Sequence, residues 1–94
     1  MVIDVRSPAE FVGPLGHIPG TINLSLDALQ ERITDIVPNK ERCLSMVYKT
    51  DRRSTTAAAW LLQTGYGHVT VLRGGMEEWN RQGFPTVRDH ASTS

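Results

Sequence analysis

The chain has 94 residues, 39% of them hydrophobic, which suffices for one modest core in a single domain. Ten basic and ten acidic residues cancel and are interspersed along the chain, which argues against nucleic acid and membrane surfaces as partners. A single cysteine, Cys43, excludes a disulfide framework and a cysteine-rich metal site. Because no stretch resembles a membrane span or a signal peptide, we expect a soluble, cytoplasmic domain.

The N-terminal half begins with a short β-branched run, residues 1–5, that is typical of a buried strand. Ser7, Pro8 and Glu10 then form the pattern of a capping box, which predicts a short helical turn. Glycine and proline keep residues 13–20 irregular, and residues 21–24 can pair as a brief strand. Apolar residues at three- and four-residue spacing predict an amphipathic helix from Leu26 to Ile36, which Pro38 closes.

The C-terminal half repeats this alternation. A strand over residues 43–47 is followed by a helix from Thr55 to Thr64, with Ser54 as its N-cap and Gly65 as its left-handed stop; its expected apolar face is Ala58, Leu61 and Leu62. Residues 68–72 predict another strand, and residues 74–83 a short helix before Pro85. We expect one domain over residues 1–86 and a disordered tail over residues 87–94. The alternation predicts an α/β fold with a mainly parallel sheet, whose binding sites lie at the carboxyl ends of the strands.

The segment between the strand at residues 43–47 and the next helix is suited to holding an anion. Backbone N–H groups of a tight strand-to-helix turn converge there, and the positive end of the helix dipole adds to them. Lys49 and Arg52 can offer charge-assisted hydrogen bonds to an oxyanion, although both can equally be solvated side chains of a turn.

Four stretches resemble successive signatures of rhodanese-homology domains, the single-domain sulfurtransferases: "VIDVRSPAEF", "GHIPGTINL", "YKTDRRS" and "VTVLRGGMEEW". The resemblance covers Met1 to Pro85 and implies a rhodanese-like, three-layer fold with helices on both faces of the sheet. In that family the loop begins with the catalytic cysteine, followed by five residues and commonly a serine. Counting back from Ser54 places Tyr48 at the cysteine position. The active-site loop is then Tyr48, Lys49, Thr50, Asp51, Arg52 and Arg53, one residue shorter than the loop of related phosphatases.

Tyrosine at this position changes the expected chemistry. A cysteine there attacks a sulfur donor as a thiolate and carries the sulfur as a persulfide, whereas a phenol is protonated at neutral pH and cannot form that bond. Cys43 cannot replace the missing cysteine, because the extended strand puts Cys43 about 16 Å from Tyr48. We expect Cys43 to be a small core residue. We therefore expect a catalytically silent module that binds an anion or a protein. The alternative is a sulfurtransferase in which Tyr48 occupies the place of the natural nucleophile, with a small sulfur-containing anion such as thiosulfate as its ligand.

The resemblance also implies supporting residues for the loop. Asp4 matches a family aspartate that pairs with an arginine at the place of Arg53, and an acid in an apolar strand needs such a partner. Arg6 resembles the family's substrate-side arginine, with an exposed strand-end arginine as the alternative.

We expect no cofactor or metal. His17, His68 and His90 lack metal-ligand spacing, and packing explains Trp60 and Trp79. Gly74 and Gly75 lack the third glycine of a dinucleotide fingerprint, and we expect them to form a tight turn beside the loop.

Family members usually have a helix and a strand before the "IDVR" strand. The chain can therefore be a natural short form, begin at a misplaced start or be trimmed from a longer one, and self-association through an uncovered surface is one consequence to expect.

Overall fold

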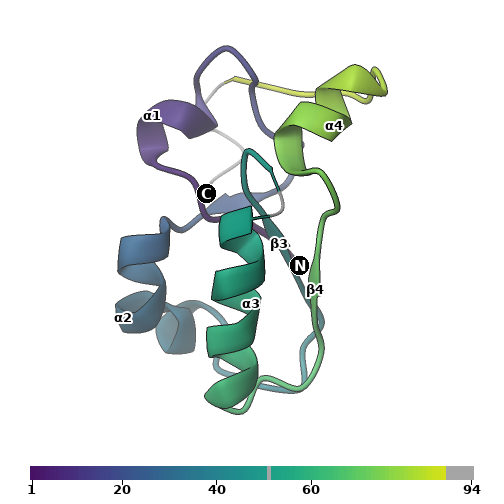
Figure 1. The fold of residues 1–94 in the computed structure, drawn as a ribbon. Coiled ribbons are helices and arrows are strands. Elements are labelled where there is room, and N and C mark those ends of the chain that lie inside the picture. The colour runs from purple at the N-terminus through teal and green to yellow at the C-terminus, as the bar shows by residue number, and fades with distance from the viewer. Residues whose placement is uncertain (51, 89–94) are drawn as a thin grey trace.

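The computed structural model describes residues 1–50 and 52–88, without the side chains of residues 52–54. Strands and helices alternate along the described chain (Figure 1). Their bounds are β1 Val2–Asp4, α1 Pro8–Phe11, β2 Ile22–Asn23, α2 Leu26–Ile36, β3 Leu44–Val47, α3 Arg52–Gln63, β4 Val69–Val71 and α4 Gly75–Arg81. The strands form one parallel sheet in the order β2-β1-β3-β4, which confirms the expected α/β class.

One face of the sheet carries the main core. Ile3 of β1 pairs with Met46 of β3, so their side chains lie on the same face, and both are fully buried. α2 and α3 lie side by side over this face (Figure 1). They bury their apolar stripes against it, namely Leu29 and Ile33 from α2 and Ala57, Ala58 and Leu61 from α3. The 3.6-residue periodicity of both helices is therefore explained by this contact.

α1 and α4 lie at the carboxyl ends of the strands, the end at which the chain leaves β3 for α3 (Figure 1). Each is anchored by one buried apolar side chain, Phe11 in α1 and Met76 in α4. This arrangement places both short helices next to the β3–α3 loop, the segment between Val47 and Arg52.

Several sequence signals are confirmed. The side chain of Ser7 accepts from the backbone N–H of Glu10, and the Glu10 carboxylate accepts from the backbone N–H of Ser7, which completes the capping box. α2 has the expected bounds. Gly65 and Gly83 both have positive φ angles, as expected for residues that end helices.

Three expectations about the C-terminal half are wrong. α3 begins at Arg52, so Ser54 lies inside its first turn and is not its N-cap. Leu62 is 51% exposed, because the buried face of α3 is formed by Ala57, Ala58 and Leu61. Cys43 is exposed and precedes β3, so it is not a core residue.

The last described residues contact the domain. Val87 and His17 exchange backbone hydrogen bonds of 2.8 and 2.9 Å, and Arg88 donates from Nη2 to the carbonyl of Pro14. The remainder of the expected tail lies outside the described residues. Within the described ranges, no helix has the length and apolar character needed to cross a membrane.

Candidate functional site

Tyr48 is the first residue after β3 and opens the β3–α3 loop, as the sequence predicts. Its side chain is half-buried and packs against the main core. It also lines a small cavity of about 100 Å³ next to Val5 and Glu10, together with Ser25, Leu26 and Asp27 at the start of α2. The Tyr48 side chain thus borders a cavity that lies between the end of β1 and the start of α2.

The backbone of the loop is held by the start of α4. Met76 donates its backbone N–H to the carbonyl of Tyr48 at 2.8 Å, and Glu77 donates to the carbonyl of Lys49 at 3.0 Å. Peptide units are planar and trans, so the N–H on the other side of each unit points the opposite way. The N–H groups of Lys49 and Thr50 therefore point away from α4.

Two glycines make this contact sterically feasible. Gly74 and Gly75 have φ angles of 75° and 60°, a region that L side chains rarely adopt. A Cβ atom on Gly75 would lie 2.3 Å from the carbonyl oxygen of Tyr48 and 2.7 Å from the carbonyl carbon of Lys49. The expected tight turn beside the loop is confirmed, and a side chain at position 75 would separate α4 from the loop.

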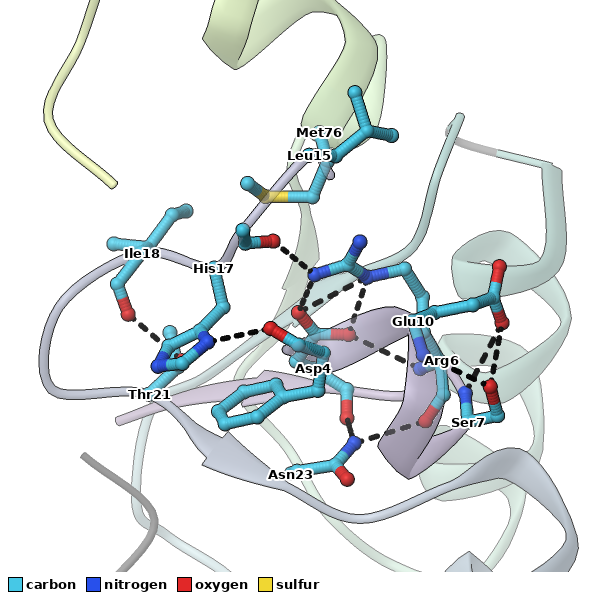
Figure 2. A network of polar contacts seen from close by, with 12 residues as sticks. Asp4, Arg6, Ser7, Glu10, Leu15, His17, Ile18, Thr21, Asn23 and Met76 are labelled. Carbon is cyan, nitrogen blue, oxygen red and sulfur yellow. Dashed lines mark hydrogen bonds and ion pairs between the residues drawn. The ribbon is translucent and has the colours of Figure 1, made fainter. Parts of the chain in front are cut away.

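Asp4 is paired with Arg6 (Figure 2). The carboxylate is fully buried and accepts from Arg6 Nε at 2.9 Å and Nη2 at 2.7 Å, as well as from the Arg6 backbone N–H. Arg6 Nη2 also donates to the carbonyl of Gly16 at 2.6 Å. The alternative of an exposed strand-end arginine is wrong, because Arg6 is 1% exposed. Removing one partner of such a buried pair typically costs about 3–5 kcal/mol.

The Arg53 side chain lies outside the described residues, so its pairing with Asp4 stays a prediction. The same holds for Asp51 and for the side chains of Arg52 and Ser54. Thr50 is half-buried, and Lys49 is 53% exposed, with its Nζ 3.8 Å from the Glu77 carboxylate. Of the expected loop residues, the structure therefore brings Tyr48 and Lys49 together with Asp4 and Arg6 at one end of the sheet.

The thiol of Cys43 lies at the opposite end of the sheet. Cys43 precedes the four residues of β3 and Tyr48 follows them, so the length of the strand separates the two positions. The structure therefore does not bring Cys43 to the β3–α3 loop.

Two contributors to the site were missed from the sequence. His17 is fully buried and stacks on Phe11 with ring centroids 3.5 Å apart, and its Nδ1 lies 2.6 Å from the Phe11 carbonyl (Figure 2). Glu77 contacts Lys49. Both belong to motifs that resemble the family's, but nothing in the local pattern of the sequence indicates these contacts. In the part of the chain that the structure describes, no three histidine, cysteine or acidic residues gather as a metal site.

The chain is similar to a known protein family and to several known proteins. The family described as "Rhodanese-like domain" matches residues 1–82. A sulfurtransferase of Allochromatium vinosum is 37% identical over 93% of this chain and 78% of its own length, and the thiosulfate sulfurtransferase PspE of Escherichia coli is 36% identical over 81% of this chain and 70% of its own. Other relatives are longer, and the chain spans 47% of one and 20% of another.

The solved structure of "rhodanese with anions from E. coli" superposes with a TM-score of 0.78 at 32% identity, covering 94% of this chain and 96% of that one. Its fold agrees with the parallel sheet and flanking helices described above. The chain is therefore a member of the rhodanese-like domain family, whose single-domain relatives are sulfurtransferases.

Proposed function

We propose that this rhodanese-like domain is catalytically silent in thiosulfate sulfur transfer and acts as an anion-binding or protein-interaction module. One observation carries the proposal: the loop opens with Tyr48, and the chain's only thiol, Cys43, lies at the far end of β3. A sulfurtransferase of this kind needs a thiolate at the loop to receive and hold the sulfur.

Anion binding is supported by the backbone of the loop. The carbonyls of Tyr48 and Lys49 accept hydrogen bonds from α4, which orients the following N–H groups toward the opposite side. The dipole of the twelve-residue helix α3, which begins at Arg52, favours negative charge at the same end. Isothermal titration with thiosulfate, sulfate and phosphate tests this part; if no oxyanion binds at millimolar concentration, only the protein-interaction role is left.

Catalytic silence is tested by thiocyanate formation from thiosulfate and cyanide. The unaltered chain and Tyr48→Ser should both be inactive, whereas Tyr48→Cys should gain turnover if the loop is competent. Adding Cys43→Ser to Tyr48→Cys should leave that turnover unchanged, because the sulfur is carried at position 48. Turnover by the unaltered chain that disappears in Cys43→Ser would overturn the proposal.

The second candidate is an active sulfurtransferase whose natural nucleophile position is occupied by Tyr48 in this chain. Its support is the family itself, since the Allochromatium vinosum relative is called a sulfurtransferase and PspE a thiosulfate sulfurtransferase. Tyrosine and cysteine codons also differ by one base. Mass spectrometry of the unaltered chain after incubation with thiosulfate distinguishes the two candidates: a gain of one sulfur atom supports sulfur transfer, and an unmodified Cys43 counts against sulfur transfer by that residue.

A further inference from the structure

A second cavity lies beside the loop, between α1, the turn at residues 13–16 and the start of α4. Its volume is about 440 Å³ and it is lined by Arg6, Glu10, Pro14, Leu15, Lys49 and Glu77. It differs from the small cavity at Tyr48, which lies toward α2. Four of its lining residues are charged, two of each sign, and the other two are apolar.

The buried side chain of Arg6 lines this cavity, and one nitrogen of its guanidinium group has no hydrogen-bond acceptor among the described residues. Arg6 uses Nε and Nη2 to bind Asp4 and Nη2 to bind the Gly16 carbonyl. Among the described residues none accepts a hydrogen bond from Nη1, which points away from Asp4 (Figure 2). The guanidinium is fixed in place by its other contacts, so its remaining N–H groups are oriented before any ligand arrives.

The acidic groups of the cavity are only partly engaged. Glu10 accepts from Ser7 through Oε1, which leaves Oε2 for a further donor. Glu77 and Lys49 are each 53% exposed, and their charged atoms are 3.8 Å apart, beyond hydrogen-bond distance. An exposed pair of this kind is weak, so both side chains can turn toward a ligand.

This charge arrangement discriminates between ligand classes. A simple anion would meet Glu10 and Glu77 as well as Arg6 and Lys49, and a simple cation would leave the Nη1 donors of Arg6 without an acceptor. A molecule that carries one negative and one positive group offers a partner to the two cations, Arg6 and Lys49, and to the two carboxylates of the cavity. A short apolar side chain on such a molecule fits the wall formed by Pro14 and Leu15.

We propose that this cavity binds a zwitterionic amino acid. Its carboxylate contacts Arg6 and Lys49, its ammonium group lies toward Glu10 and Glu77, and its side chain packs on Pro14 and Leu15. The inference goes beyond the proposed silence of the domain and does not depend on it, because binding requires no sulfur transfer.

Three probes of one shape test the proposal: L-leucine, 4-methylpentanoate, which lacks the ammonium group, and 3-methylbutan-1-amine, which lacks the carboxylate. Each is titrated into the full chain while backbone amide shifts are followed by NMR. Leucine should give saturable shifts at Leu15, Lys49 and Glu77, and each analogue should bind roughly tenfold more weakly, the factor expected for one lost charge-assisted contact. Equal binding of leucine and either analogue overturns the proposal, as does the absence of any shift at these amides up to the solubility limit of leucine.

Two surface variants connect the binding to the named residues. Lys49→Gln and Glu77→Gln should each weaken leucine binding by roughly tenfold without changing the thermal midpoint, because both side chains are exposed. Arg32→Gln, which removes an exposed cation from α2, is the matched control and should bind leucine unchanged. If all three variants bind leucine equally well, the ligand does not use this cavity. Such a result leaves the assignment of a silent loop untouched, since that assignment rests on Tyr48.

Discussion

Replacing Gly75 with alanine should separate α4 from the β3–α3 loop. The new Cβ would lie 2.3 Å from the carbonyl oxygen of Tyr48, and neither atom can move without shifting backbone. A positive φ costs alanine about 1–2 kcal/mol. Displacing α4 also weakens the hydrogen bonds from Met76 and Glu77 to the loop, each contributing about 0.5–1.5 kcal/mol. We expect Gly75→Ala to lower the free energy of unfolding by about 2–5 kcal/mol.

Gly83→Ala is the matched control at the other end of α4. Gly83 also has a positive φ, 77°, but no atom lies within 4 Å of the position its Cβ would take. Gly83→Ala should lower the free energy of unfolding only by the cost of a positive φ for alanine, about 1–2 kcal/mol. Urea unfolding of the three proteins, followed by circular dichroism, measures the difference. Equal destabilisation by the two substitutions would refute the reasoning, because the close approach to Tyr48 would then contribute nothing.

Three further predictions concern the packing of α3, the hydroxyl group of Tyr66 and the surface of α4. Leu61→Ala should cost about 2–5 kcal/mol and Leu62→Ala less than about 0.5 kcal/mol in urea unfolding, because the first side chain is fully buried and the second is 51% exposed; similar losses would contradict the packing of α3. Tyr66→Phe should cost about 1–3 kcal/mol, since the buried hydroxyl donates at 2.7 Å to a carbonyl at the end of α2 that would lose its partner; an unchanged thermal midpoint would exclude that bond. Hydrogen bonds from Arg81 and then Gln82 lower the pKa of Glu78, so its stabilising contribution is present above the ordinary carboxyl pKa and is lost as the pH falls through the lowered value. Glu78→Gln should therefore reduce the thermal midpoint slightly at neutral pH, with a difference that disappears in acid; a difference independent of pH would contradict this origin.

The parts of the fold that could be predicted from sequence are those fixed by local chemistry. The capping box at Ser7 and Glu10 satisfies backbone groups within one turn, and the apolar stripe of α2 repeats with the helical period. Gly65 and Gly83 end helices because a positive φ is strained for other residues. None of these features depends on contacts with distant parts of the chain.

Two of the wrong predictions concern the first residues of α3 and β3, which the local sequence pattern does not determine. Ser54 is a good N-cap in isolation, but α3 begins two residues earlier, at Arg52. Cys43 was expected to be the first residue of a buried strand and therefore a core residue. β3 begins one residue later, at Leu44, so Cys43 lies outside the strand. The contact between Asp4 and Arg6 forms beyond the end of β1, where the chain bends at Arg6, so the alternation of side chains along a strand does not predict it. The pairing of Asp4 with Arg53, which the resemblance implies, stays a prediction, because the Arg53 side chain lies outside the described residues.

The placement of β1 inside the sheet affects how the domain folds. β1 pairs with β2 on one side and with β3 on the other, so Ile3 must meet residues 22 and 46. To form such contacts between distant residues, the chain must first lose the entropy of closing large loops. Such contacts therefore favour slow, concerted folding. The β3–α3 loop is attached to the second of these pairings. It can therefore take up its shape only after the centre of the sheet has assembled, and a nascent chain that has not yet released residues 44–47 has neither a core nor a site.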